Sequence, residues 1–282
     1  MISLQELIKE IKNLEPVPAV VNQLLASADD PHCSMTTISD IVQYDPAITA
    51  NLIRTCNSAY FGLSNPVESV RDAVSLLGMD KIVELVLLNS SRKALSKKQK
   101  GYGLDKGAMW RYSVSSALIA RGISQKTDAE NHNTLFTAAL LKDIGKTVLD
   151  RFVTNAFDKI THLVKDEGYS FSEAEKQLIG IDHAELGAMI VKIWKFSPTM
   201  VKIIRHHHLS DENLRNDRDI ATVYLADCIC MMMGIGVGAD GLAYRFHGDV
   251  LQNLNINSDD LSHIIADFTF NMKKFETLLK LV

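Results

Sequence analysis

The sequence has few cysteines and no excess of positive charge. The four cysteines, Cys33, Cys56, Cys228 and Cys230, show neither a disulfide nor a zinc-site spacing. A formal net charge of -4 argues against a protein whose main role is to bind nucleic acid. Residues 1–16 alternate charged and apolar residues at helical spacing, unlike a secretory signal. We therefore expect a reduced, cytoplasmic protein.

The sequence also lacks runs of alternating β-branched residues. Apolar residues instead recur at three- and four-residue intervals along most of the chain. The longest apolar stretch, residues 220–239, contains Asp227 and three glycines, so we interpret it as a buried helix and not as a membrane span. Asp-Pro at 45–46 and Ser-Pro at 197–198 are typical helix starts. The pattern predicts an all-α protein.

The cations divide the chain into parts. Residues 91–107 hold six Lys or Arg, one Asp and three glycines. We expect an N-terminal helical subdomain over residues 1–95, a connection over 96–107, and a larger helical subdomain with C-terminal helices over 108–282. The lysines around the connection would form either an anion or nucleic-acid surface or a solvated linker. The acidic composition of the whole chain favours the linker.

Several motifs follow one another in a characteristic order. They are Asp45-Pro46-Ala47, NSAYFG at 57–62, SLLG at 75–78, Trp110, LLKDIGK at 140–146, DHAELG at 182–187 and RHHH at 205–208. Over roughly residues 10–235 they resemble HDOD domains, the HD-related output domains of bacterial signalling proteins. The resemblance implies a multi-helix HD-like bundle with an N-terminal helical subdomain. It also implies a bacterial protein that acts through signalling partners.

Five ionisable residues occur where the helical pattern predicts a core: Asp143, His183, His207, His208 and Asp227. LLKDIGK sets Asp143 inside an apolar helical pattern, and Asp227 is the only charge in its apolar stretch. Buried carboxylates and imidazoles need a cation, a metal or a hydrogen-bond partner. Together these side chains are ligands that suit Fe, Mn or Zn.

The resemblance gives these positions a meaning. HD-superfamily phosphohydrolases hold metal with an early histidine, an adjacent His-Asp pair and a later aspartate. Relatives that hydrolyse cyclic dinucleotides add further histidines, and by this resemblance those correspond to His183, His207 and His208. The metal of such enzymes activates a water that attacks phosphate.

The chain departs from this pattern at decisive places. Tyr112 stands where the first histidine is expected, and Lys142 stands where the histidine of His-Asp belongs. Leu209 replaces a glutamate that often follows the histidines, and no Gly-Tyr-Pro stretch follows. By the resemblance, Tyr112 and Lys142 join the five ionisable residues as positions of a vestigial HD site.

Lys142 changes the electrostatics of that site. Opposite unit charges 4 Å apart attract by about 4 kcal/mol at an effective dielectric constant of about 20, and a dication beside an ammonium is repelled by about twice that. We hypothesise that Lys142 is an internal cation that reaches Asp143 or Asp227. The alternative is that Lys142 points into solvent. Leu135 and Ala138 on the same helical face favour the internal position.

We therefore predict a non-catalytic output or scaffold domain that acts through protein partners, with no resident cofactor or metal and no binding to DNA or membrane. One alternative is a metal-dependent phosphohydrolase with an altered ligand set, in which Asp143, His183, His207 and Asp227 converge on an ion. The other is a sensor that binds a nucleotide or a small anion without turnover. GIGVGADG, residues 234–241, follows a helix and predicts a helix stop and a loop.

Overall fold

The prediction of an all-α fold is confirmed over the part of the chain that the structure, a computed structural model, describes: residues 4–14, 16–243 and 246–281. Helices and their connections make up these residues, with no strand beyond an isolated antiparallel bridge between Gln99 and Leu104.

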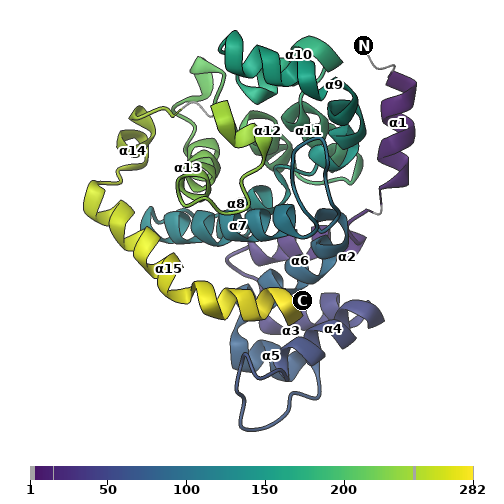
Figure 1. Ribbon diagram of the computed structural model, residues 1–282. Coiled ribbons are helices and arrows are strands. Elements are labelled where there is room, and N and C mark those ends of the chain that lie inside the picture. Colours follow the sequence, from purple (N-terminus) through teal and green to yellow (C-terminus); the bar gives the residue numbers. More distant parts are fainter. Residues whose placement is uncertain (1–3, 15, 244–245, 282) are drawn as a thin grey trace.

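The N-terminal part contains the first six helices. They are α1 (Leu4–Asn13), α2 (Ala19–Ala28), α3 (Met35–Gln43), α4 (Pro46–Cys56), α5 (Val70–Leu77) and α6 (Met79–Leu95). In Figure 1, α3, α4 and α5 lie together at the lower end of the molecule. They pack against one another, and α2 and α6 join them to the rest of the protein, where both contact α8.

The larger part follows. Its helices are α7 (Ala108–Lys126), α8 (His132–Leu141), α9 (Lys146–Asp166), α10 (Phe171–Ile179), α11 (His183–Ile193), α12 (Pro198–His206), α13 (Arg218–Met232), α14 (Asp249–Leu254) and α15 (Ser258–Leu281), with 3-10 helices η1 (Glu212–Leu214) and η2 (Ala239–Ala243). Helix α7 crosses the middle of the molecule and packs against α8, α13 and α15 (Figure 1). Helix α12 packs against α8, α11 and α13, which brings distant segments to one site.

Local sequence sets where many of these helices begin. The Asp45 carboxylate accepts hydrogen bonds from the first turn of α4, and the Ser197 hydroxyl does so for α12, each with proline next in the chain. Ser69 and Ser170 form capping boxes at the starts of α5 and α10. The expected starts at 46 and 198 are confirmed, and the last helix begins at Ser258.

The apolar stretch at 220–239 begins as a buried helix. Ile220 to Cys230 in α13 are all buried. Across the described residues, no helix combines the length and apolar character needed to cross a membrane. The glycine-rich stretch that follows α13 is a loop leading into η2, as the sequence predicts.

The segment at 96–107 is not the solvated linker that composition favours. Tyr102 is fully buried, and Gln99 and Leu104 are nearly so. The Gly101 N–H donates to the Asp150 carboxylate, and the Tyr102 carbonyl accepts from the Ala239 N–H. Its lysines point outward, whereas its aromatic and apolar residues fasten it to the larger part of the protein.

Candidate functional site

The LLKDIGK motif forms the turn between α8 and α9. Asp143 therefore lies in this turn. The apolar pattern predicted a position inside a helix, and that prediction is wrong. Helix α8 ends at Leu141 with Lys142 as its C-cap, and hydrogen bonds from Ile144 N to Leu141 O and from Lys146 N to Asp143 O tighten the chain before α9 begins. A Cβ at Gly145 would lie 2.0 Å from the His183 carbonyl oxygen. Glycine at this position lets the turn press against the start of α11.

The side chain of Lys142 points into the protein and is 0% exposed. Its Nζ lies 2.6 Å from Asp227 Oδ1 and also contacts Asp143 Oδ2. The structure thus places the ammonium between both carboxylates, the position that the internal-cation hypothesis gives it. Burial alone would lower the pKa of Lys142, but the two carboxylates more than offset this and raise it, so the ammonium stays charged.

Tyr112 completes the surroundings of this ammonium. Its hydroxyl donates to Asp227 Oδ1 at 2.5 Å, and Lys142 Nζ lies 4.4 Å from the centre of its ring. The face of an aromatic ring attracts a cation, and this attraction is strongest where water is excluded. Tyr112 therefore stabilises the ammonium of Lys142 as well as the carboxylate of Asp227.

A second ammonium reaches the same cluster. Lys146 Nζ lies 2.8 Å from Asp143 Oδ1 and 2.5 Å from Asp240 Oδ2, and all three side chains are buried. Burial would lower the pKa of Lys146, but Asp143 and Asp240 raise it. Both oxygens of Asp143 are thus occupied by ammonium groups.

These cations hold the aspartates in their charged form. Burial would raise the pKa of Asp143, but the ammonium groups of Lys142 and Lys146 hold it well below its usual range. Burial acts on Asp227 in the same direction, and Lys142 outweighs it, so that this pKa is lowered too. The centre of the site is a network of buried ion pairs in which each carboxylate needs its cation.

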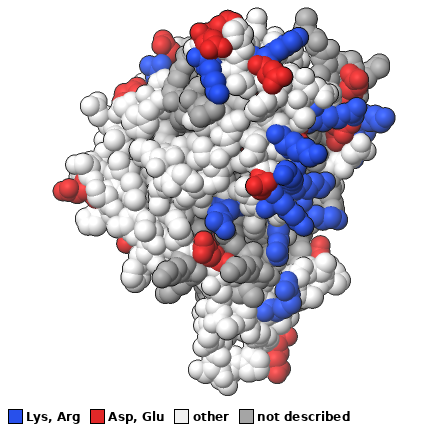
Figure 2. All heavy atoms as spheres, in the orientation of Figure 1, with Lys and Arg blue, Asp and Glu red and all other residues white. Residues whose placement is uncertain are grey.

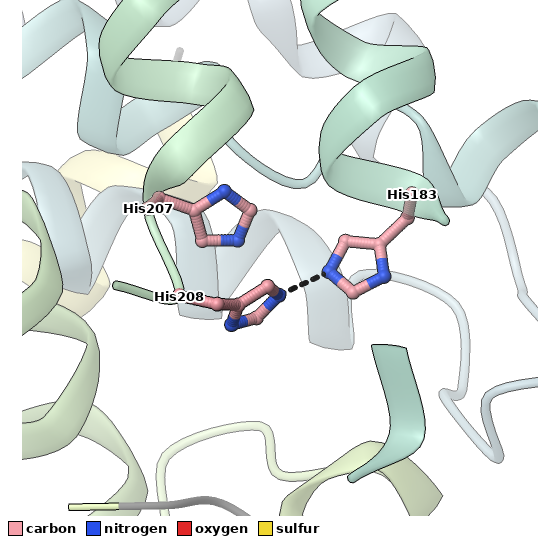
Figure 3. A group of neighbouring side chains, drawn as sticks. All are labelled: His183, His207 and His208. Atoms are coloured by element: carbon pink, nitrogen blue, oxygen red, sulfur yellow. Dashed lines mark hydrogen bonds between the residues drawn. The ribbon is translucent and has the colours of Figure 1, made fainter. Parts of the chain in front are cut away.

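Three histidines lie beside this network (Figure 3). Helix α12 ends at His206, so His207 and His208 lie in the turn that follows it. The sequence pattern placed them on the buried face of the helix itself. His207 is fully buried and His208 is partly buried. Figure 3 shows both rings facing His183 at the start of α11, with 2.8 Å between Nε2 of His208 and Nε2 of His183.

Neighbouring acceptors fix the orientation of two of these rings. His183 Nδ1 lies 2.6 Å from Glu175 Oε2, which also accepts the His183 backbone N–H, and Tyr102 OH donates to Glu175 Oε1 at 2.5 Å. His207 Nδ1 lies 2.8 Å from the Ile204 carbonyl oxygen and donates to it. The Nε2 atoms of both rings therefore point into the site, 3.7 Å and 3.9 Å from Asp143 Oδ1.

The surroundings shift the pKa values of the three histidines in opposite directions. Burial lowers the pKa of His207 to about 3 and that of His208 well below its usual value. Burial acts on His183 in the same direction, but Glu175 more than offsets it, so the pKa of His183 is raised. His207 and His208 are neutral at pH 7, and the buried Nε2 of His207 has no hydrogen-bond partner among the residues that the structure describes.

The capacity to hold a metal ion differs between the two halves of the site. At Asp143 and Asp227 the carboxylate oxygens are occupied by ammonium and hydroxyl groups, so a dication there would meet two positive charges. The donor atoms of His183, His207 and His208, in contrast, lie within 4.8 Å of one another. Imidazoles whose Nδ1 atoms are fixed by a carboxylate and a carbonyl are typical metal ligands.

A cavity of about 190 Å³ opens next to the histidines. Its lining includes Lys146, His208, Arg215, Asp240 and His247. Typical small-molecule sites measure about 300–1,000 Å³, so this cavity suits a small polar or anionic molecule better than a nucleotide.

The seven residues predicted from the sequence all lie at this site, but four further members were missed: Tyr102, Lys146, Glu175 and Asp240. Glu175 follows Phe171 by four residues and so shares the buried face of α10, a signal that the sequence offered. Tyr102 and Asp240 lie in segments interpreted as a linker and a loop. Tyr102 contacts Glu175, 73 residues further along the chain, and Asp240 contacts Lys146, 94 residues before it.

Fold and site together define a class: an all-α HD-like bundle with a buried Lys-Asp pair at the turn between α8 and α9. A model of the HDOD domain family matches residues 14–210. The chain belongs to the HDOD family.

Solved structures share this fold across the whole chain. An HDOD domain protein of unknown function from Geobacter sulfurreducens is 23% identical, with a TM-score of 0.70 and coverage of 99% of both chains. A protein from Shewanella amazonensis, provisionally named a phosphohydrolase, is also 23% identical, with a TM-score of 0.69 and coverage of 98% of this chain and 97% of that one. An uncharacterised protein from Treponema pallidum is 19% identical over 199 residues, which are 70% of this chain and 38% of that protein.

Replacing the buried ammonium tests the ion-pair network. We expect Lys142→Met to lower the free energy of unfolding at pH 7 by about 3–5 kcal/mol, because Asp143 and Asp227 lose a shared cation that burial makes necessary. Chemical denaturation measures the loss, with exposed Lys192→Met as the matched control. Adding Asp227→Asn to the Met variant should recover part of the stability. A Lys142→Met protein as stable as the parent would contradict this account.

The buried neutral imidazole of His207 predicts an acid-sensitive fold. The unfolded chain takes up a proton at this residue near pH 6.5, whereas the folded chain does so near pH 3. The stabilisation is therefore complete above about pH 6.5 and is lost as the pH falls toward about 3. His208 acts in the same direction and His183 in the opposite one.

Urea unfolding of the parent and of His207→Asn between about pH 6.5 and about pH 4 measures this contribution. Asn can keep the hydrogen bond to the Ile204 carbonyl but cannot take up a proton. We expect its free energy of unfolding to fall less steeply with decreasing pH, by up to about 1.4 kcal/mol per pH unit. Exposed His32→Asn controls for the substitution itself. Parallel curves for the parent and His207→Asn would refute the assignment.

Proposed function

We propose that this HDOD domain is a non-catalytic output or scaffold module of bacterial signal transduction that acts through protein partners. The observation that carries the proposal is the pair of buried lysines, Lys142 and Lys146, whose ammonium groups occupy both oxygens of Asp143. The HD site would then be a structural ion-pair network inside the larger subdomain.

The electrostatics of this network support the absence of metal-dependent hydrolysis at Asp143. A dication placed among the aspartates would have to displace Lys142 Nζ from Asp227 and Lys146 Nζ from Asp143, and each displaced ammonium would lose a buried partner. At about 4 Å and an effective dielectric constant of about 20, each ammonium that remained would repel the ion by about 8 kcal/mol. Hydrolysis that begins with a water activated by metal has no starting point there.

The other side chains described at the site do not offer an obvious catalytic group in place of a water activated by metal. The side chain of His207 has a free Nε2, but it is 0% exposed, so a substrate cannot approach it within hydrogen-bond distance without rearrangement. His183 and Glu175 bind each other, and Tyr102 binds Glu175. These contacts fix the side chains for packing and leave few free for proton transfer.

A second candidate function rests on the three imidazoles. His183, His207 and His208 could hold a transition-metal ion with nitrogen ligands alone, next to the cavity of about 190 Å³. This differs from the altered ligand set that the sequence suggested, because Asp227 is bound to Lys142 and Tyr112. The candidate predicts bound metal, and hydrolysis only of a substrate small enough to enter that cavity.

We infer that the domain acts by binding protein partners in signal transduction. A structurally similar protein from Marinobacter aquaeolei, 19% identical with a TM-score of 0.71, is provisionally named a signal transduction protein. Membership of the HDOD family favours partner binding over chemistry. We expect neither DNA nor membrane as the partner.

Metal content and hydrolysis together test the proposal. We expect the purified protein to contain far less than one equivalent of transition metal. With added Mn²⁺ or Fe²⁺, we also expect no turnover of a generic phosphodiester or of cyclic dinucleotides above the background without protein. The variants Asp143→Ala and His207→Ala, with exposed Asp158→Ala as the control, show which side chains matter for any signal.

Each outcome separates the candidates. Stoichiometric metal with turnover abolished by Asp143→Ala would overturn the non-catalytic proposal. Stoichiometric metal that is lost in His207→Ala but kept in Asp158→Ala would favour the site of three imidazoles. Traces of metal that no substitution changes, without turnover, would support the module that acts through partners.

A further inference from the structure

A basic groove lies away from the HD site. Figure 2 shows Lys and Arg side chains gathered along the right-hand side of the molecule, with few acidic residues among them. A groove of about 620 Å³ is lined by Asn51, Arg54, Asn89, Arg92, Lys93, Ser96, Lys97, Lys98 and Lys106. Six of these nine lining residues are cations, and none is acidic, in a chain whose net charge is -4.

Three separate segments build the basic groove. Asn51 and Arg54 come from α4, Arg92 and Lys93 from the last turn of α6, and the remaining lysines from the segment at 96–107. Cations in the last turn of a helix are expected, because they face its carbonyl end. That explanation covers Arg54 in the last turn of α4 as well as the two residues of α6, but not the three lysines of the segment at 96–107. The other cations converge on the groove through the fold.

The segment at 96–107 presents its lysines from a fixed backbone. Gln99, Tyr102 and Leu104 are buried, and Gln99 and Leu104 exchange backbone hydrogen bonds at 2.9 Å. Lys97, Lys98 and Lys106 lie on the outer side of this anchored loop and are exposed. A solvated linker would spread its charges over many conformations, whereas this loop holds them along one groove.

None of the nine residues that line the groove is acidic, so the lining itself supplies no carboxylate to these cations. The ion pair of Lys98 with Asp105, 2.9 Å long, joins two exposed side chains and is weakened by solvent. A cluster of like charges in one groove raises the local potential and attracts an anionic partner. It also speeds association more than it raises affinity.

The other lining residues indicate which kind of anion fits. The groove contains no aromatic side chain, whereas surfaces for single-stranded nucleic acid generally stack bases on aromatic rings. Its neutral members, Asn51, Asn89 and Ser96, carry amide and hydroxyl groups that can bond to a peptide backbone. The groove thus offers charge for the carboxylates of a polypeptide and lacks, among its lining residues, the rings on which single-stranded bases would stack.

We propose that this basic groove is the docking surface for an acidic segment of a partner protein. The inference rests on the proposed function, because it supplies the partner surface of a module that acts through proteins. It places that surface on α4, α6 and the anchored segment at 96–107, outside the HD site.

A binding measurement with the full chain tests the groove. The probe is a fluorescein-labelled peptide rich in Asp and Glu, followed by fluorescence anisotropy. An otherwise identical Asn and Gln peptide and a labelled single-stranded oligonucleotide serve as comparisons. The groove variant is Lys97→Glu with Lys106→Glu. The control variant, Lys159→Glu with Lys165→Glu on α9, changes the net charge equally at exposed positions outside the groove.

We expect the acidic peptide to bind the parent, and binding to weaken as the salt concentration rises from about 0.01 M to about 0.15 M, where the Debye length falls from about 30 to about 8 Å. The groove variant should raise the Kd by about tenfold or more, and the control variant by less than about twofold. Circular dichroism and the thermal midpoint confirm that both variants fold.

Three results would overturn the proposal: no binding of the acidic peptide to the parent, equal loss in both variants, or tighter binding of the oligonucleotide with the same dependence on the groove. The last result would assign the groove to nucleic acid. Hydrolysis abolished by Asp143→Ala would overturn the non-catalytic function without changing these Kd values, so the failure of one proposal is distinguishable from the failure of the other.

Discussion

The ammonium group of Lys142, held between Asp143 and Asp227, is the interaction on which the rest of the site depends. Without it, two carboxylates from the α8–α9 turn and from α13 would face each other in a region that excludes water. Tyr112 places its ring and its hydroxyl around the same pair, and Lys146 extends the network to Asp240. The converging carboxylates are thus neutralised by side chains of the chain itself.

A large share of this arrangement could be predicted from the sequence, for reasons that are local. Apolar spacing and helix caps such as Ser197 before Pro198 act over a few residues, and they predicted the all-α fold and several helix starts. The inward direction of Lys142 followed from Leu135 and Ala138 on one helical face. Asp143 was wrongly placed inside a helix, because the close approach of Gly145 to α11 that accompanies the turn is a tertiary contact.

The residues that were missed share a physical cause. Tyr102 belongs to a segment whose lysines and glycines resemble a linker, yet its ring and hydroxyl are buried against α10. Asp240 belongs to a loop that has no regular pattern, and only the fold brings it to Lys146. The same anchored segment at 96–107 that carries Tyr102 inward carries its lysines outward. A contact that supports the HD site thus also fixes the basic groove, and the two features share a structural origin.

The position of Lys142 in the presence of a competing metal tests the central claim most directly. The measurement is a crystal structure of the protein grown with excess Mn²⁺, with the ion located by its anomalous scattering. We expect Lys142 Nζ to lie within hydrogen-bond distance of Asp143 and Asp227, with no anomalous peak between these carboxylates. A manganese ion bound by both aspartates, with the side chain of Lys142 turned away, would contradict it.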